Sequence, residues 1–385
     1  MSPCLKKEDF KLKQLNISQV STFFANGSYP IEFLFYYPYK INNNKLRKAL
    51  KKISREFWPA FGIYSNGRIT KKAFLEDDCY GFSTVDDIFN PNLEQDKLYK
   101  KYGSTNPETT QRLFYLKVIQ FTNGTVLIPK MNHVAGDGYS YFYLLTVLAA
   151  VTKRIGIPLI PTIIKLIFKP KVQNLIADAF HFTKIPQEAI SFDENMKVEV
   201  LEVKQSEVRN QAKLLSDSSG LRISSNDILC ANIVKFIVEK RKETLPNNFK
   251  LAIPIDVRRG ISELGQRFFG NGLIMYNVPF IRDEVNKLSI EDIALTIRKS
   301  FPVRNRESYE TFLKKIEEWI NSGQLEKLRP YDPDNECLVT NLSRMPISKL
   351  DFGSGPPTLI EPLTRGRSGA AILAQNDKFI LRFAS

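Results

Sequence analysis

A strand that ends at a histidine and turns directly into a long helix constrains this chain more than any other feature. The segment is His133-Val134-Ala135-Gly136-Asp137-Gly138. Two apolar, β-prone runs precede it, joined through Thr122-Asn123-Gly124, and an Asn-Gly pair between such runs indicates a β-hairpin. The run from Tyr139 to Arg154 has helical length, no internal Pro or Gly and a basic last turn. The sequence therefore predicts that His133 is held at a strand end and that Asp137 caps the helix.

This histidine is a candidate general base. The chain has two histidines, and the other is His181. Histidine is the side chain whose ordinary pKa lies near neutral pH. A histidine that acts as general base near pH 7 must therefore be one of these two. The six residues alone leave a second interpretation open, in which His133 only hydrogen-bonds within its own loop.

The segment and its hairpin resemble the HxxxDG signature of the BAHD acyltransferases, and more distantly that of chloramphenicol acetyltransferase and of peptide-synthetase condensation domains. Further stretches follow in the BAHD order. They are FLFYYPY (Phe33 to Tyr39) with the passage that follows it to Ile69, ISSNDILCANIVKFIVEKRK (Ile223 to Lys242), PIDVRR (Pro254 to Arg259) with RFFGNG (Arg267 to Gly272), and VTNLSRMPISKLDFGSGPP (Val339 to Pro357). Two family tryptophans are replaced, by Leu342 after the "VTS" position and by Ser354 in the DFGWG position.

The expected fold class is α/β, an α+β sandwich, because helices and strands interleave in both halves of the chain. A length of 385 residues is typical of two domains. The resemblance implies two similar chloramphenicol-acetyltransferase-like domains with a tunnel between them. We expect residues 1–170 to form the domain with HxxxDG, 171–195 a crossover linker, and 196–385 the domain with the DFG loop.

The remaining elements are predicted from periodicity and from breaker residues. The helices expected are Asn44 to Phe57, Glu207 to Leu215, Asn226 to Arg241, Ile290 to Ser300 and Tyr309 to Ser322. The strands expected are Met196 to Lys204, Lys250 to Val257, Gly272 to Phe280, Cys337 to Ser343 and a closing hairpin from Ala370 to Phe383.

The resemblance also implies roles for the residues around the base. His133 would take the proton of the acceptor, and the hydroxyl of Thr340 would donate to the oxyanion. An ordinary strand threonine explains Thr340 equally well. Asp137 would point away from the imidazole and pair with Arg258, as a structural pair.

Other positions are expected to shape or bind without reacting. Gly136 and Gly138 permit a close turn, and Asn271 is read as a turn residue. Asp351, Gly353 and Gly355 would form a structural loop. Ser224 and Ser225, at a helix N-terminus, are candidates for binding coenzyme A, although a serine there is more often an N-cap.

Composition narrows the partners. The net charge of +14 is spread along the chain, which is typical of a solvated surface and compatible with a polyanionic donor such as coenzyme A. No nucleic-acid-binding motif is present, so nucleic acid is not an expected partner. Cys4, Cys79, Cys230 and Cys337 lack metal or disulfide spacing. We expect a cytoplasmic monomer with no permanently bound cofactor and no metal, which uses acyl-CoA as co-substrate.

Residues Ile155 to Lys171 mix bulky apolar side chains with lysines. This composition suits weak binding to an anionic membrane, but a crossover between domains explains it as well.

Three functions stay open. The first is transfer from acyl-CoA to a hydroxyl or amine of a small molecule. The second takes the acyl group from a carrier-protein thioester, as condensation-type relatives do, and the third is a non-catalytic binding protein that kept the fold. The DFG and FFGN segments favour the first, and the intact His133 and Gly138 argue against the third.

Overall fold

The computed structural model describes residues 14–25, 30–103, 112–154, 197–262, 264–302, 305–324, 329–363 and 366–384. The predicted linker 171–195, the segment 155–171 and His181 lie outside these residues.

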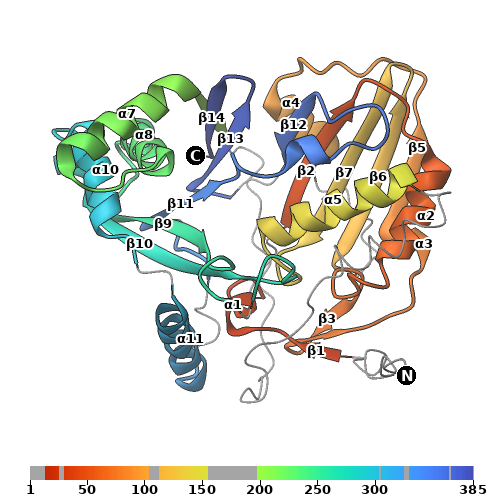
Figure 1. Ribbon diagram of the computed structural model, residues 1–385, viewed down its shortest axis with the longest axis horizontal. Helices are drawn as coiled ribbons and strands as arrows, with labels where there is room; N and C mark the ends of the chain where they lie inside the picture. The colour runs from red at the N-terminus through yellow and green to blue at the C-terminus, as the bar shows by residue number, and fades with distance from the viewer. Residues whose placement is uncertain are drawn as a thin grey trace, which may run out of the picture.

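One layer is a five-stranded sheet with the order β12-β2-β7-β6-β5 (Figure 1). Its strands are β2 (Pro30–Tyr37), β5 (Tyr80–Thr84), β6 (Phe114–Phe121), β7 (Gly124–Asn132) and β12 (Leu359–Pro362). The strands β6 and β7 form the predicted hairpin, in which Phe121 is paired with Gly124. Both faces of the central strands are buried, since few of their residues reach solvent.

Two helices cover one face of this sheet (Figure 1). The helix α2 (Asn43–Ile53) buries Leu46, Ala49, Leu50 and Ile53, the spacing of one helical stripe. It packs beside α5 (Gly138–Arg154), which is buried along most of its length. The opposite face is covered by α4 (Gln95–Tyr102) and by a smaller apolar cluster around Phe89.

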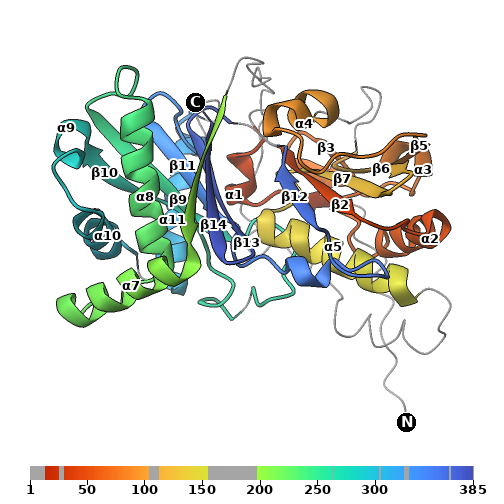
Figure 2. The same ribbon diagram turned by 90° about the horizontal axis from the view of Figure 1, so that it is seen from above.

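The second layer is a six-stranded sheet with the order β10-β9-β11-β13-β14-β8. Its strands are β8 (Val198–Lys204), β9 (Asn248–Asp256), β10 (Leu273–Ile281), β11 (Glu336–Asn341), β13 (Gly369–Gln375) and β14 (Lys378–Ala384). The helix α8 (Ser225–Lys240) lies on this sheet (Figure 2). The helices α7 (Gln205–Ser219) and α10 (Ile290–Lys299) pack against α8.

The strand β12 joins the two layers. It belongs to the second half of the chain but pairs antiparallel with β2 of the first sheet, Glu361 opposite Leu34. The buried side chain of Glu361 forms an ion pair with Arg382 of β14, and Arg382 also donates to the carbonyl of Pro362. The sequence did not predict that a strand from the second half of the chain joins the first sheet. The proposed division at 171–195 stays a prediction, because that linker is not described.

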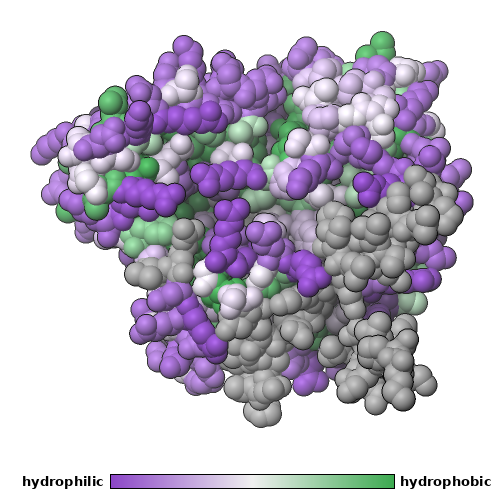
Figure 3. All heavy atoms as spheres, in the orientation of Figure 1, coloured by the Kyte–Doolittle hydropathy of each residue, from purple (hydrophilic) through white to green (hydrophobic). Residues whose placement is uncertain are grey.

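Short elements fill the space below and around the two sheets. They are β1 (Gln14–Asn16), α1 (Gln19–Thr22), β3 (Ile63–Ser65), β4 (Arg68–Thr70), α3 (Glu76–Cys79), α9 (Arg282–Val285), α11 (Arg306–Asn321) and the 3-10 turn η4 (Ile347–Lys349). The strands β1, β4 and β3 form a small sheet, and α11 packs on α1. In the orientation of Figure 3, hydrophilic residues cover most of the coloured part of the surface, and a group of hydrophobic residues shows between the two halves.

The predicted α/β class with two sheets and covering helices is confirmed. The helix predicted over Glu207 to Leu215 is longer in the structure, and it ends at Gly220, whose φ of 67° provides a left-handed C-cap. In the part of the chain that the structure describes, no helix is long and apolar enough to cross a bilayer.

Candidate active site

His133 directly follows β7, in a tight turn that leads into α5. The turn is closed by hydrogen bonds from the Ala135 amide to the Asn132 carbonyl and from the Gly136 amide to the His133 carbonyl. A Cβ on Gly136 would lie 2.8 Å from the Cβ of Ser140, so a larger residue would push the helix away. Short strand-to-helix geometry thus fixes the backbone of His133.

Asp137 binds Arg258, which comes from the segment after β9, in the other half of the molecule. The guanidinium donates to both carboxylate oxygens at 2.9 Å, a bidentate pair in which Arg258 and Asp137 are 2% and 4% exposed. Asp137 also accepts from the Ser140 amide at 3.0 Å and from the Gly272 amide at 2.9 Å. It therefore caps α5 and ties it to the loop before β10, and no hydrogen bond links it to the imidazole.

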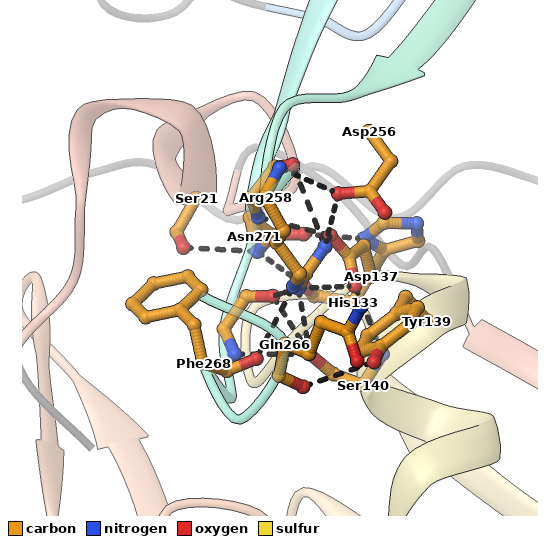
Figure 4. Close-up of polar contacts among 12 residues, drawn as sticks. Ser21, His133, Asp137, Tyr139, Ser140, Asp256, Arg258, Gln266, Phe268 and Asn271 are labelled. Carbon is orange, nitrogen blue, oxygen red and sulfur yellow. Dashed lines mark hydrogen bonds and ion pairs between the residues drawn. The ribbon is translucent and has the colours of Figure 1, made fainter. Parts of the chain in front are cut away.

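The environment keeps both groups of this pair charged. Burial opposes ionisation of Asp137, but the charge and hydrogen bonds of Arg258 outweigh it and lower the pKa of the carboxyl. Burial likewise opposes the charge of Arg258, and Asp137 raises the pKa of the guanidinium. Arg258 also donates to the carbonyls of Phe268 and Gly270 and to Ser140 Oγ, so that it is enclosed by acceptors (Figure 4).

The imidazole of His133 is held by Asn271, from the Phe-Phe-Gly-Asn-Gly stretch. His133 Nδ1 lies 3.1 Å from Asn271 Oδ1, while Asn271 Nδ2 donates to the His133 carbonyl at 2.8 Å and to Ser21 Oγ at 2.9 Å (Figure 4). Because the amide nitrogen already donates to two acceptors, the oxygen faces the ring, and Nδ1 must carry the hydrogen. In the neutral ring this leaves a lone pair on Nε2, which has no hydrogen-bond partner among the described residues.

The protonation state of the ring suits a base. Partial burial reduces the hydration of the imidazole and lowers the pKa of His133 from its ordinary 6.5 to about 4, although Asp137, the backbone of His133 and Asn271 pull it in the other direction. Above this value the ring is neutral and able to accept a proton.

A test of this environment is the pH dependence of kcat/KM. A base with a lowered pKa stays deprotonated as pH falls, so we expect an acidic limb with a midpoint near 4 and a flat rate from about pH 6 to 8. Initial rates in buffers of constant ionic strength measure it. A limb centred at or above 6.5 would show that water reaches the ring.

Residues 82–379, most of the chain, match the Transferase family. The chain belongs to this family, the BAHD acyltransferases. The fold is similar to that of vinorine synthase, with a TM-score of 0.73, 17% identity, and coverage of 97% of this chain and 90% of that one. It is also similar to TRI101 of F. graminearum complexed with ethyl coenzyme A, with a TM-score of 0.73, 12% identity, and 96% and 94% coverage.

The first condensation domain of the CDA synthetase is similar at a TM-score of 0.59, with 11% identity over 96% of this chain and 89% of that domain. At these identities the structural similarities show the fold alone. A comparison with curated proteins found no match.

In this BAHD chain Thr340 lies on β11, opposite Ala371 of β13. The Leu342 amide still donates to the Ile372 carbonyl, so the extended backbone continues to Leu342, and residues two apart share one face of a strand. Leu342 lies against the start of α5, because a Cβ on Gly138 would be 3.5 Å from its Cδ2. Thr340 is therefore placed on the sheet face that turns toward α5, and its hydroxyl has no hydrogen-bond partner in the described part of the chain.

Asp351 organises the DFG loop at the other end of α5. Its Oδ1 accepts from the amides of Gly353 and Gly355, and its Oδ2 is 2.5 Å from Lys153 Nζ. Lys153 is fifteen residues beyond Gly138, which is about 22 Å along a helix axis. These contacts favour the predicted structural role. Gly353 and Gly355 have φ of 148° and 118°, values that a side chain rarely adopts.

Ser224 is occupied as a helix cap. Its amide and hydroxyl both donate to Asp227 Oδ2, at 2.7 and 2.8 Å, and Arg298 pairs with the same carboxylate. Asp227 therefore holds the position at which a phosphate would accept hydrogen bonds from this turn of α8. The predicted contact of Ser224 with coenzyme A gains no support from this geometry, whereas that of Ser225 stays a prediction.

Sequence reasoning missed Asn271 as a partner of the base. Its only sequence signal is its place in the Phe-Phe-Gly-Asn-Gly stretch, where an asparagine beside glycines reads as a turn. No group of three or more His, Cys, Asp or Glu that would hold a metal occurs among the described residues.

Proposed function

We propose that this BAHD acyltransferase moves an acyl group from acyl-CoA to a hydroxyl or amine of a small-molecule acceptor, with His133 as general base. The observation that carries the proposal is the hydrogen bond between His133 Nδ1 and Asn271 Oδ1, which directs the free lone pair to Nε2. A neutral imidazole with one nitrogen held and the other free is the arrangement that a base requires.

The reaction is a direct transfer. His133 Nε2 takes the proton of the acceptor O–H or N–H as its oxygen or nitrogen attacks the thioester carbonyl. The tetrahedral intermediate then expels the CoA thiolate, and the imidazolium returns the proton to the sulfur, so the enzyme ends unchanged.

A covalent cysteine intermediate has no support in the described residues. Cys79, Cys230 and Cys337 are buried free thiols. Burial raises the pKa of Cys79 to about 12 and that of Cys337 to about 11, and it raises that of Cys230 as well. A thiol kept protonated is a poor nucleophile.

Coenzyme A as the donor is supported by the fold. Solved structures of TRI101 hold coenzyme A together with T-2 or deoxynivalenol, which are small-molecule ligands of that protein. The net charge of +14 on our chain favours association with the phosphates of a CoA thioester.

Thr340 is the proposed oxyanion donor. Thr340→Val removes the hydroxyl and keeps the shape, so we expect kcat to fall by about 10²-fold, the usual effect of one lost donor, with KM for acyl-CoA little changed. Thr340→Ser, which keeps the hydroxyl, is the matched control and should retain most activity. Equal activity of the Val variant and wild type would remove Thr340 from the mechanism.

The function is tested by the release of free CoA from acetyl-, malonyl- and long-chain acyl-CoA in the presence of panels of alcohols and amines. We expect acceptor-dependent release with at least one pair, and mass spectrometry then distinguishes an ester from an amide product. A second series of assays offers the same acyl groups on a pantetheinylated carrier protein. Transfer from the carrier alone would replace acyl-CoA as the donor, and no transfer from either would favour a binding role.

A further inference from the structure

The segment 14–25, here called the arm, begins in the small sheet and reaches His133 with its last residues. Its strand β1 pairs with β4, and Ser18 caps α1 by accepting from the Ser21 amide. After α1, Phe23 packs against Phe312 of α11, with ring centroids 5.9 Å apart. The arm is thus anchored at both ends independently of His133.

Two side chains of the arm reach the base or its partner. The ring of Phe24 is stacked on the imidazole of His133, with centroids 3.7 Å apart and an angle of 16° between the planes. Ser21 Oγ accepts from Asn271 Nδ2 at 2.9 Å (Figure 4). Both residues are almost fully buried, so these contacts are not shared with bulk water.

Each contact removes a different freedom of the ring. Stacking fixes the plane of the imidazole and covers one of its faces. The orientation of the Asn271 amide is set by the His133 carbonyl, which can only accept, and Ser21 Oγ accepts the second hydrogen of Asn271 Nδ2 and so adds to this hold; a flipped amide would direct its nitrogen to His133 Nδ1. A flipped amide would favour hydrogen on Nε2, and the lone pair would leave the position where a substrate proton is taken.

We infer that Phe24 and Ser21 are positioning residues, which set the ring plane and the tautomer of His133. The inference rests on the proposed function, because it deepens the assignment of His133 as base. One consequence is geometric: because the Nε2 lone pair lies in the plane of the ring, the stacked Phe24 sets the direction from which an acceptor hydroxyl or amine must approach.

The direct test is the tautomer itself. The chain has two histidines, so protein labelled with ¹⁵N-histidine gives two sets of ring signals, and a His181→Gln variant assigns them. At neutral pH we expect hydrogen on Nδ1 of His133 in the wild type. Ser21→Ala leaves the His133 carbonyl as the one described acceptor of Asn271 Nδ2, so the fraction of the Nε2–H form should rise, and Ser21→Thr, which keeps the hydroxyl, should match the wild type. An unchanged tautomer in Ser21→Ala would overturn the role of Ser21.

Phe24→Leu is compared with Phe23→Leu. Both replacements remove an equally buried ring from adjacent positions of the arm, but only the first touches the imidazole. With an acceptor in hand, we expect Phe24→Leu to lower kcat by roughly 10- to 100-fold through misplacement of the base, and to raise the midpoint of the acidic limb as water reaches the ring. Phe23→Leu weakens one anchor of the arm but removes no contact of the imidazole, so it should change both far less.

Equal effects of the two leucine variants would show that Phe24 only packs. The tautomer is measured without any substrate, so it reports on the arm even where no acyl transfer is found. Absence of transfer with an intact Nδ1–H tautomer would therefore contradict the proposed function and not the positioning role.

Discussion

His133→Ala is expected to lower kcat/KM for acyl transfer by at least about 10²- to 10⁴-fold, the usual contribution of a general base. Two other groups among the described residues cannot easily take over as base, because Asp137 is engaged by Arg258 and the cysteines are buried as thiols. The CoA-release assay with the best acceptor from the panel measures the loss.

Binding of acyl-CoA and the melting temperature should stay close to wild type in this variant, since the contacts of the imidazole with other described residues are one amide and one stacked ring. His181→Ala is the matched control for loss of the other histidine and should keep full activity. Wild-type transfer by His133→Ala would refute the assignment of the base.

The position of His133 was predictable because every signal for it is local. An Asn-Gly hairpin, a strand end and a capped helix all lie within about forty residues of sequence, and each has its own residue pattern. The pairing of Asp137 with Arg258 was expected from the family resemblance alone. Hydrophobic periodicity does not indicate which acidic side chain pairs with which basic one when the two lie 121 positions apart in the sequence.

The partners of His133 were not predictable for the same reason. Asn271 is 138 positions away and reads as a turn residue, and the short helix that carries Ser21 has a single turn. The strand β12 was missed because its four residues include Pro362, and a proline demotes a run to an edge strand. It is an edge strand, beside β2 only.

Ser224 is a position at which residue type alone predicts two different roles, a helix cap and an anion site. A serine followed three positions later by an acidic residue is a capping box, and it also resembles an anion site. The structure favours the cap, because the carboxylate of Asp227 accepts from both the amide and the hydroxyl of Ser224. Sequence alone left both open, since each uses the same amide groups.

Separating Asp137 from Arg258 is expected to produce the largest loss of stability. Breaking a buried ion pair leaves one charge without its partner, which destabilises a fold by about 3–5 kcal/mol. We expect this loss in the free energy of unfolding for both Asp137→Asn and Arg258→Leu, with activity falling in parallel as α5 and the loop before β10 lose their connection. Asp256→Asn is the control, because Asp256 binds the same guanidinium but its side chain is 43% exposed, and its loss should be below about 1 kcal/mol.

The pH dependence of stability identifies the charge that is left behind. In the wild type Arg258 holds the pKa of Asp137 below its ordinary value, so the pair stabilises the fold above an unfolded pKa of about 3.9 and less as pH falls through the folded pKa. In Arg258→Leu the guanidinium is gone, and burial, the largest influence on this carboxyl, raises its pKa against the amide hydrogen bonds from Ser140 and Gly272, so the native state takes up the proton that the unfolded state releases. The variant should therefore lose stability as pH rises from about 4 to 8, opposite to the wild-type contribution of this group.

Denaturant unfolding at several pH values measures how the free energy of unfolding of the wild type and of the variant changes with pH. The variant with both replacements should lose less free energy of unfolding than the two single variants lose together. Strictly additive losses with no pH dependence would show that the two side chains do not depend on each other.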